Sequence, residues 1–98
     1  MNDAAGCERV FTVQHKLGLH ARPAGRFVAL ASKFQADVEV AREAEGAEWV
    51  SGRSVLSLLS LAAGFGTRLR LRAAGTDAAE ALAALGQVLE TPIQGDGG

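Results

Sequence analysis

Residues 18–24 read Gly-Leu-His-Ala-Arg-Pro-Ala, and they stand where a strand pattern ends and a helix pattern begins. Upstream, Glu8 to Gln14 is strand-like, with Phe11 and Val13 alternating against Val10, Thr12 and Gln14. Downstream, apolar residues recur at the spacing of one helix face: Ala21, Ala24, Phe27, Val28 and Ala31. Pro23 fits this helix only in its first turn, where its missing N–H would have no partner in any case. The sequence therefore predicts a helix over about residues 21–32, with His20 at its N-cap or first position.

That position of His20 suggests phosphate chemistry. A helix N-terminus presents N–H groups without helical partners and the positive end of the macrodipole, so it favours a bound anion. The same field and the neighbouring Arg22 disfavour a protonated imidazole, so we expect His20 to offer a neutral, nucleophilic nitrogen. A phosphoryl group there would meet the N–H groups of Ala21 and Arg22 and a guanidinium suited to phosphate. The alternative is that His20 is only a polar capping or surface residue.

A second motif, Arg53-Ser54, precedes the short apolar run Val55-Leu56-Ser57-Leu58-Leu59. Ser54 is a favourable N-cap, which alone would account for it. We expect a helix that Gly64 and Gly66 close, with one buried stripe made of Val55, Leu58, Leu59 and Ala62. Leu56 falls on the polar side of this helix, where it is either a scattered surface leucine or part of a docking patch.

With both motifs in place, the chain resembles the HPr family, the histidine-containing phosphocarrier proteins of the bacterial phosphoenolpyruvate-dependent phosphotransferase system. The family signature is Gly-Leu-His-x-Arg-Pro-Ala, and its second signature is a Lys-Ser or Arg-Ser pair that opens a short apolar helix. The resemblance covers about residues 8–90 and implies a carrier that is not an enzyme, needs no cofactor and is phosphorylated on His20 beside Arg22. It also implies that Ser54 is a regulatory site for the HPr kinase. Family members regulated in this way often have glycine three residues later, where this chain has Ser57, so the plain capping role of Ser54 stays open.

The implied partners are enzyme I, as the phosphoryl donor, and enzyme IIA-type acceptors. The net charge is only −1, yet four basic residues fall near the two motifs: Arg22, Arg26, Lys33 and Arg53. This local bias suits acidic protein partners. We therefore expect a docking surface that contains Arg26, Arg53, Val55 and Leu56.

Composition excludes several other classes of protein. Ninety-eight residues make a single domain, 1–98, with a core over about 8–90 and short flexible tails. A net charge of −1 gives no electrostatic indication of nucleic-acid binding. No run reaches the roughly 18 apolar residues of a membrane span. The lone Cys7 excludes an internal disulfide and fits a reducing cytoplasm. His15 has no partners at ligand spacing, so we expect an ordinary surface side chain and no metal site.

The remaining elements complete the fold. We expect strands at Asp37–Arg42, Glu48–Ser51 and Arg68–Arg72, and a last helix at Ala78–Glu90 that Gly75, Thr76 and Asp77 cap. The order βαββαβα then predicts an α+β open-faced sandwich: a four-stranded antiparallel sheet with three helices on one face.

Three functions fit these observations. The leading one is a monomeric, cytoplasmic phosphocarrier that takes a phosphoryl group from phospho-enzyme I on His20 and passes it to enzyme II components of sugar uptake. The second keeps the fold and the histidine but serves the nitrogen-related branch of the system, whose output is regulation. The third is a small-molecule-binding α+β regulatory domain, which the Gly18–Ala24 motif opposes.

Overall fold

Within residues 6–92, which the computed structural model describes, strands and helices follow in the expected order βαββαβα. Their bounds are β1 (Cys7–Thr12), α1 (Ala21–Ala31), β2 (Asp37–Arg42), β3 (Val50–Ser51), α2 (Val55–Ser60), β4 (Arg68–Ala74) and α3 (Ala78–Glu90). The tails expected at the two ends fall, apart from Gly6 and residues 91–92, outside the described part of the chain.

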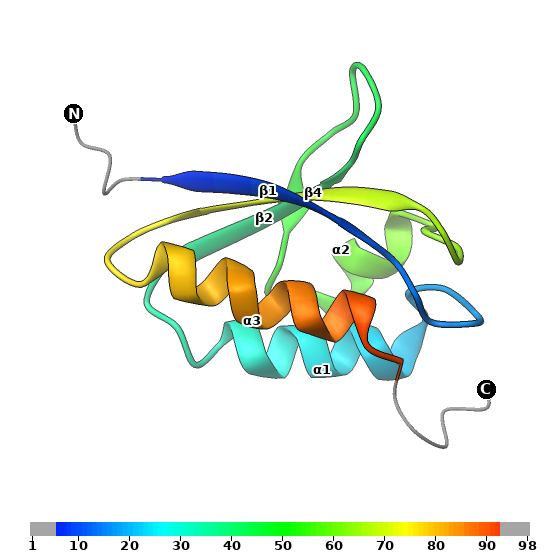
Figure 1. Ribbon diagram of the computed structural model, residues 1–98, viewed down its shortest axis with the longest axis horizontal. Coiled ribbons are helices and arrows are strands. Elements are labelled where there is room, and N and C mark those ends of the chain that lie inside the picture. Colours follow the sequence, from blue (N-terminus) through cyan, green and yellow to red (C-terminus); the bar gives the residue numbers. More distant parts are fainter. Residues whose placement is uncertain (1–5, 93–98) are drawn as a thin grey trace.

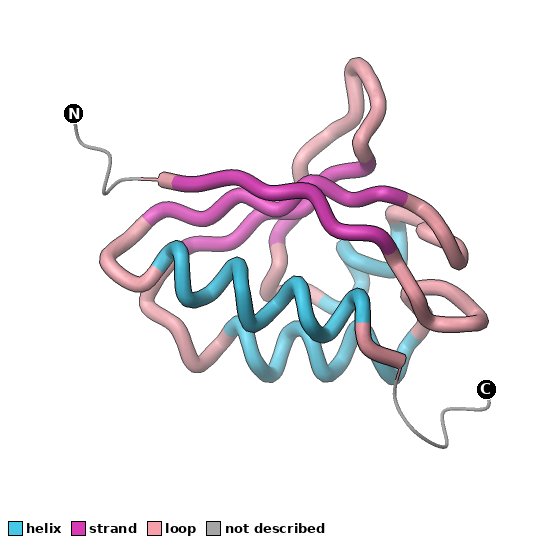
Figure 2. Tube along the Cα trace, in the orientation of Figure 1, coloured by secondary structure: helices cyan, strands magenta, loops and turns pink. Residues whose placement is uncertain are grey.

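The strands form one antiparallel sheet in the order β1-β4-β2-β3. β4 is therefore central, with Leu69 opposite Phe11 of β1 and Leu71 opposite Val40 of β2. The helices lie on one side of the sheet, where α1 and α3 run next to each other (Figures 1 and 2). This arrangement is the predicted open-faced sandwich.

The alternation of β4 decides which face is buried. Leu69 and Leu71 are fully buried under the helices. The arginines that alternate with them lie on the open face and form three ion pairs: Arg68–Glu43, Arg70–Glu8 and Arg72–Glu39. Solvent screens exposed pairs of this kind, which contribute little to stability, so the buried leucines dominate the stability of the strand.

Trp49 also lies on the open face of the sheet. The guanidinium carbons of Arg72 and Arg70 lie 3.9 Å and 4.9 Å from its ring centroid. The chain between β2 and β3 rises on this side of the sheet (Figure 1). Ala41, which the alternation of β2 puts on the open face, is nevertheless fully buried. Part of the open face is thus covered.

The core between sheet and helices contains an apolar stripe of α3: Ala81, Leu82, Leu85 and Leu89, all fully buried. Gly86 lies on the same side of α3, where a Cβ would overlap the ring of Phe11. The absence of a side chain therefore allows α3 to approach β1 closely.

Three strand ends differ from the sequence-based expectation. β1 stops at Thr12. The N–H of Val13 still donates in register to the carbonyl of Thr67, just before β4, but the N–H of Gln14 turns to the carbonyl of Leu89 in α3. β3 contains only Val50 and Ser51, and β4 continues to Ala74.

The end of α2 also differs. This helix ends at Ser60, and its chain reversal places Ala62, not Gly64, in the left-handed region with φ of 51°. Ala62 is exposed, so it does not belong to the predicted buried stripe. Arg42, at the end of β2, donates from Nη1 to the carbonyl oxygens of Leu61 at 2.8 Å and Ala62 at 3.2 Å.

Candidate functional site: the His20 loop

His20 is the N-cap of α1, one of the two positions predicted for it. Its backbone is extended (φ −90°, ψ −168°), and its carbonyl oxygen accepts the N–H of Ala24 at 3.0 Å. The imidazole makes no capping hydrogen bond to the helix and is partly exposed. The first turn of a helix has no helical partners for its N–H groups. The N–H groups of Ala21 and Arg22, in the first turn of α1, therefore have no acceptor within the helix.

Residues 13–20 connect β1 to α1 and form the His20 loop. Backbone hydrogen bonds and close packing fix this loop. Gly18 has φ of +81°, and a Cβ on it would lie 2.5 Å from the carbonyl oxygen of Ala63. Its N–H donates to the carbonyl of His15 at 2.8 Å. The N–H of Leu19 donates to the carbonyl of Ala63 at 2.8 Å. Gly18 is thus required by both conformation and space, and the loop rests on the turn after α2.

His15 is not the surface side chain that the sequence analysis expected. It is fully buried, and its Nε2 lies 2.6 Å from the carbonyl oxygen of Val88 in α3. A carbonyl can only accept, so Nε2 is the donor. The sequence did contain a signal, because His15 continues the inward-facing series of Phe11 and Val13 beyond the strand.

The predicted cations on α1 are exposed. Ala21 is also exposed, so it is not part of the buried face of the helix, which Ala24 and Phe27 form as expected. Among the described residues, neither Arg22 nor Arg26 forms an ion pair. Both charges therefore remain available to a phosphate or to an acidic partner.

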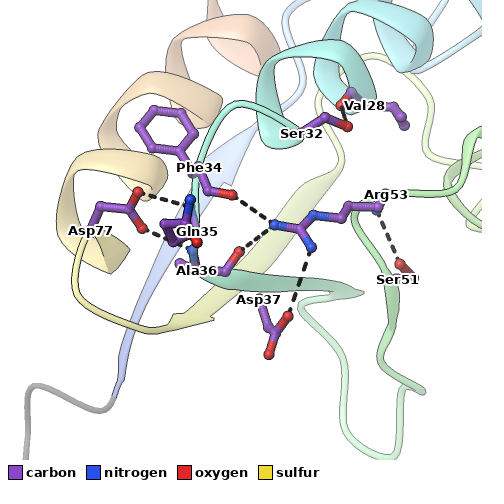
Figure 3. Close-up of polar contacts among 9 residues, drawn as sticks. All are labelled: Val28, Ser32, Phe34, Gln35, Ala36, Asp37, Ser51, Arg53 and Asp77. Carbon is purple, nitrogen blue, oxygen red and sulfur yellow. Dashed lines mark hydrogen bonds and ion pairs between the residues drawn. The ribbon is translucent and has the colours of Figure 1, made fainter.

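Arg53 lies elsewhere. Its Nη2 donates to the carbonyl oxygens of Phe34 at 2.8 Å and Ala36 at 2.9 Å, and its Nη1 lies 3.9 Å from Asp37 (Figure 3). These residues follow the C-terminus of α1, and an 11-residue helix is about 16 Å long. The structure therefore places the guanidinium of Arg53 at the opposite end of α1 from His20.

The same loop is held from its other side by Asp77. Its carboxylate accepts the N–H groups of Gln35 at 2.9 Å and Ala36 at 2.8 Å (Figure 3). These bonds, the one from Gln35 first, lower the pKa of Asp77. Asp77 is the N-cap of α3, but its side chain makes no capping bond, so its carboxylate joins α3 to the loop after α1.

Ser54 is the N-cap of α2, and its Oγ accepts the N–H of Ser57 at 3.1 Å. The His20 loop contacts Ala63, beyond the other end of α2. Ser54 therefore lies at the end of α2 that is remote from His20. Its neighbour Val55 is partly buried, whereas Leu56 is 79% exposed.

Two exposed apolar residues near His20 were missed by the sequence analysis. Leu17, in the His20 loop, is 59% exposed, and Phe65, in the loop after α2, is 64% exposed. The two loops are neighbours, since the N–H of Gly66 donates to the carbonyl of Val13. The available signal was Phe65 itself, an aromatic residue between two glycines, with no strand or helix face to bury it.

Other parts of the described chain offer less chemistry. No group of three or more His, Cys, Asp or Glu side chains within residues 6–92 could hold a metal ion. None of the helices in this range is long and apolar enough to span a membrane. A hollow of about 870 Å³ at one end of the sheet is lined by residues that include Cys7, Glu39, Arg53 and Arg72, but not His20.

Comparisons with known proteins identify relatives of this chain. A sequence model described as the PTS HPr component phosphorylation site matches residues 7–91. The phosphocarrier protein HPr of Haloferax volcanii is 46% identical over 85 residues, which cover 87% of this chain and 94% of the relative. The phosphocarrier protein NPr of Shewanella violacea is 42% identical over 78 residues, which cover 80% of this chain and 82% of the relative.

The fold agrees as well. The crystal structure of HPr from Bacillus anthracis superposes with a TM-score of 0.80 at 35% identity, covering 87% of this chain and 98% of that one. The match to the family over nearly the whole described chain shows that this protein belongs to the HPr family, the phosphocarriers of the phosphotransferase system.

Proposed function

We propose that this chain carries phosphoryl groups on His20, from phospho-enzyme I to enzyme IIA-type acceptors of a sugar phosphotransferase system. The observation that carries the proposal is the placement of the His20 ring at the N-terminus of α1, on a loop fixed by Gly18 and Leu19. That end of the helix stabilises the charge that arrives with the phosphoryl group.

The proposed step exchanges one N–P bond for another. A ring nitrogen of His20 attacks the phosphorus of a phosphohistidine on enzyme I, and the donor's N–P bond breaks as the new one forms. The ring of His20 loses one proton and the donor's ring gains one, and neither water nor a cofactor is consumed. The N–H groups of Ala21 and Arg22 and the guanidinium of Arg22 then hold the phosphoryl oxygens. In a second transfer of the same kind, phospho-His20 is the donor: its N–P bond breaks as the acceptor's nucleophile bonds to phosphorus.

The docking surface in this proposal consists of Leu17, Arg26, Val55, Leu56 and Phe65, with Arg53 at its edge. Exposed leucine and phenylalanine side chains around a charged centre are typical of protein interfaces. The exposed cations complement an acidic partner. The guanidinium of Arg53 is occupied by loop carbonyls, so its contribution to docking is the smallest of the set.

Ser54 is proposed as a regulatory phosphorylation site for an HPr kinase. A phosphate on this N-cap would receive N–H groups of α2 and would add about −1.5 to −2 charges to the docking surface. The plain capping role is the alternative, and the bond from Ser57 to Ser54 is consistent with both.

The nitrogen-related branch is the second candidate, because the relatives include a phosphocarrier named NPr. The two branches are distinguished by the phosphoryl donor. Sugar-branch and nitrogen-branch enzyme I, each supplied with phosphoenolpyruvate, should phosphorylate this chain at different rates, and we expect the sugar-branch enzyme to be faster. We further propose that the carrier acts as a cytoplasmic monomer.

The central experiment exploits the two histidines of the chain. Wild-type protein incubated with enzyme I and phosphoenolpyruvate should gain one acid-labile phosphoryl group by mass spectrometry. His20→Ala should gain none. His15→Gln, the matched control, should gain one, since a glutamine amide reaches about as far as Nε2. Phosphorylation of the His20→Ala variant to the same level as the wild-type protein would refute the assignment of His20 as the phosphorylated residue.

A further inference from the structure

We propose that Arg42 is a positioning residue for phosphoryl transfer, acting on His20 through the turn that follows α2. This inference rests on the proposed function of His20. Nothing in the sequence motifs singles out Arg42, which ends β2 at a position remote in sequence from both of them.

The first step of the argument is the strained turn. Ala62 has φ of 51°, a left-handed conformation that is unfavourable for a residue with a Cβ and easy for glycine. The surroundings must therefore stabilise it. Arg42 does so from outside the turn, with one nitrogen shared between the carbonyl oxygens of Leu61 at 2.8 Å and Ala62 at 3.2 Å. Its positive charge is also favourable at the C-terminus of a helix.

The second step connects the turn to the site. The next carbonyl along the chain, that of Ala63, accepts the N–H of Leu19 at 2.8 Å. Gly18 packs against the same carbonyl and against Gly64, so closely that a Cβ would not fit. The orientation of the turn thus determines where Leu19 lies, and Leu19 is bonded directly to His20.

The third step is the anchor of Arg42 itself. Its Cα lies opposite that of Leu69 in the centre of the sheet, so the guanidinium extends from a rigid element. Without it, the Ala62 turn would relax toward ordinary backbone angles. The carbonyl of Ala63 would rotate with the turn, and the loop that carries His20 would lose its support.

The test uses Arg42→Met, which removes the guanidinium but keeps an unbranched side chain at this exposed position. We expect amide hydrogen exchange of Leu19 to accelerate and single-turnover transfer from enzyme I to slow about three- to tenfold, as when one charge-assisted bond to a positioning element is lost. Arg42→Lys should keep most of the rate, because a single nitrogen makes both contacts. Arg68→Met, which removes a neighbouring cation that pairs only with Glu43 among the described residues, is the matched control and should change neither readout.

A second substitution tests whether Arg42→Met acts on His20 through the Ala62 turn. Ala62→Gly relieves the left-handed strain, so adding it to Arg42→Met should restore both Leu19 protection and the transfer rate. Unchanged Leu19 exchange in Arg42→Met would overturn the inference. So would slow transfer that Ala62→Gly fails to restore, since that would indicate direct contact between Arg42 and the partner. If wild-type protein accepts no phosphoryl group, the proposed function fails, while Leu19 exchange still decides the positioning role.

Discussion

Nε2 of His15 donates to the carbonyl oxygen of Val88 at 2.6 Å, and this bond joins the start of the His20 loop to the last turns of α3. The two residues are 73 positions apart in the sequence. The His15 side chain is fully buried, so the loop that carries the proposed phosphorylation site is tied to the core of the fold on one side and to the α2 turn on the other.

His15→Ala should destabilise the protein by about 2–4 kcal/mol, because it leaves a cavity and a buried carbonyl without its donor. Urea unfolding followed by circular dichroism measures this loss. His15→Gln should recover much of the stability, since it retains an N–H donor. Equal losses in the two variants would show that packing alone, and not the bond to Val88, holds this end of the loop.

Arg22→Lys keeps the charge beside His20 but loses the planar group that can hold two phosphoryl oxygens at once. We expect phosphoryl transfer to slow about tenfold or more while thermal stability stays within about 0.5 kcal/mol, since Arg22 is exposed and forms no ion pair among the described residues. Single-turnover kinetics measures the transfer rate, and thermal unfolding measures the stability. An unchanged rate would indicate that the charge alone matters or that Arg22 faces away.

Ser54→Ala should lose about 0.5–2 kcal/mol of stability, because the N–H of Ser57 loses its acceptor. Ser54→Asp should retain the cap and interact favourably with the helix N-terminus. Its extra negative charge should nevertheless slow transfer from enzyme I to His20 at low salt, and added salt should reduce the effect. Transfer by Ser54→Asp at the wild-type rate in low salt would leave Ser54 as a structural cap only.

Two glycines in helices provide a matched pair. Gly86→Ala puts a Cβ into the ring of Phe11, and overpacking of this kind costs about 1–3 kcal/mol. Gly25→Ala meets no neighbouring atoms and should stabilise α1 by up to about 1 kcal/mol through helix propensity. Phe11→Leu should partly rescue Gly86→Ala. Chemical denaturation of the four proteins measures these differences, and a stabilised Gly86→Ala would contradict the close packing of α3 on β1.

Asp77 makes the stability of the fold depend on pH in the acidic range. The N–H groups of Gln35 and Ala36 hold the pKa of its carboxyl below the ordinary range. The unfolded chain therefore takes up this proton first as pH falls, and the stabilising effect, complete at neutral pH, fades below about pH 4. Asp77→Asn should be less stable than wild type at pH 7, and the gap should narrow as pH falls below 4. A gap that is independent of pH would show that the charge of Asp77 is not responsible.

The elements that local pattern defines were predicted well from the sequence. β4 alternates arginine and leucine, and α3 repeats its apolar residues at helical spacing. In both elements the local pattern indicates which side chains are buried. The N-cap position of His20 followed from Pro23, whose chemistry permits only the first turn. These features depend on neighbours within a few residues of one another.

The features that were missed depend on residues far apart in the sequence. The burial of His15 requires the end of α3, and the left-handed Ala62 is stabilised by Arg42, 20 positions earlier. The charge of Arg53 was counted toward the docking surface, yet carbonyl oxygens in the loop after α1 draw it to the other end of the helix. No local pattern specifies such contacts, since each is decided only when the elements pack.

The stacking of Trp49 against Arg70 and Arg72 makes this residue an intrinsic fluorescence probe of one region of the protein. The chain contains one tryptophan and no tyrosine, so its tryptophan emission reports on the open face of the sheet, where Trp49 lies against Arg70 and Arg72. Emission should respond when the segment between β2 and β3 lifts from the sheet. It should stay silent when the His20 loop, on the helix side of the molecule, receives its phosphoryl group. Fluorescence of the unlabelled chain can therefore follow unfolding of the open face without interference from the transfer reaction.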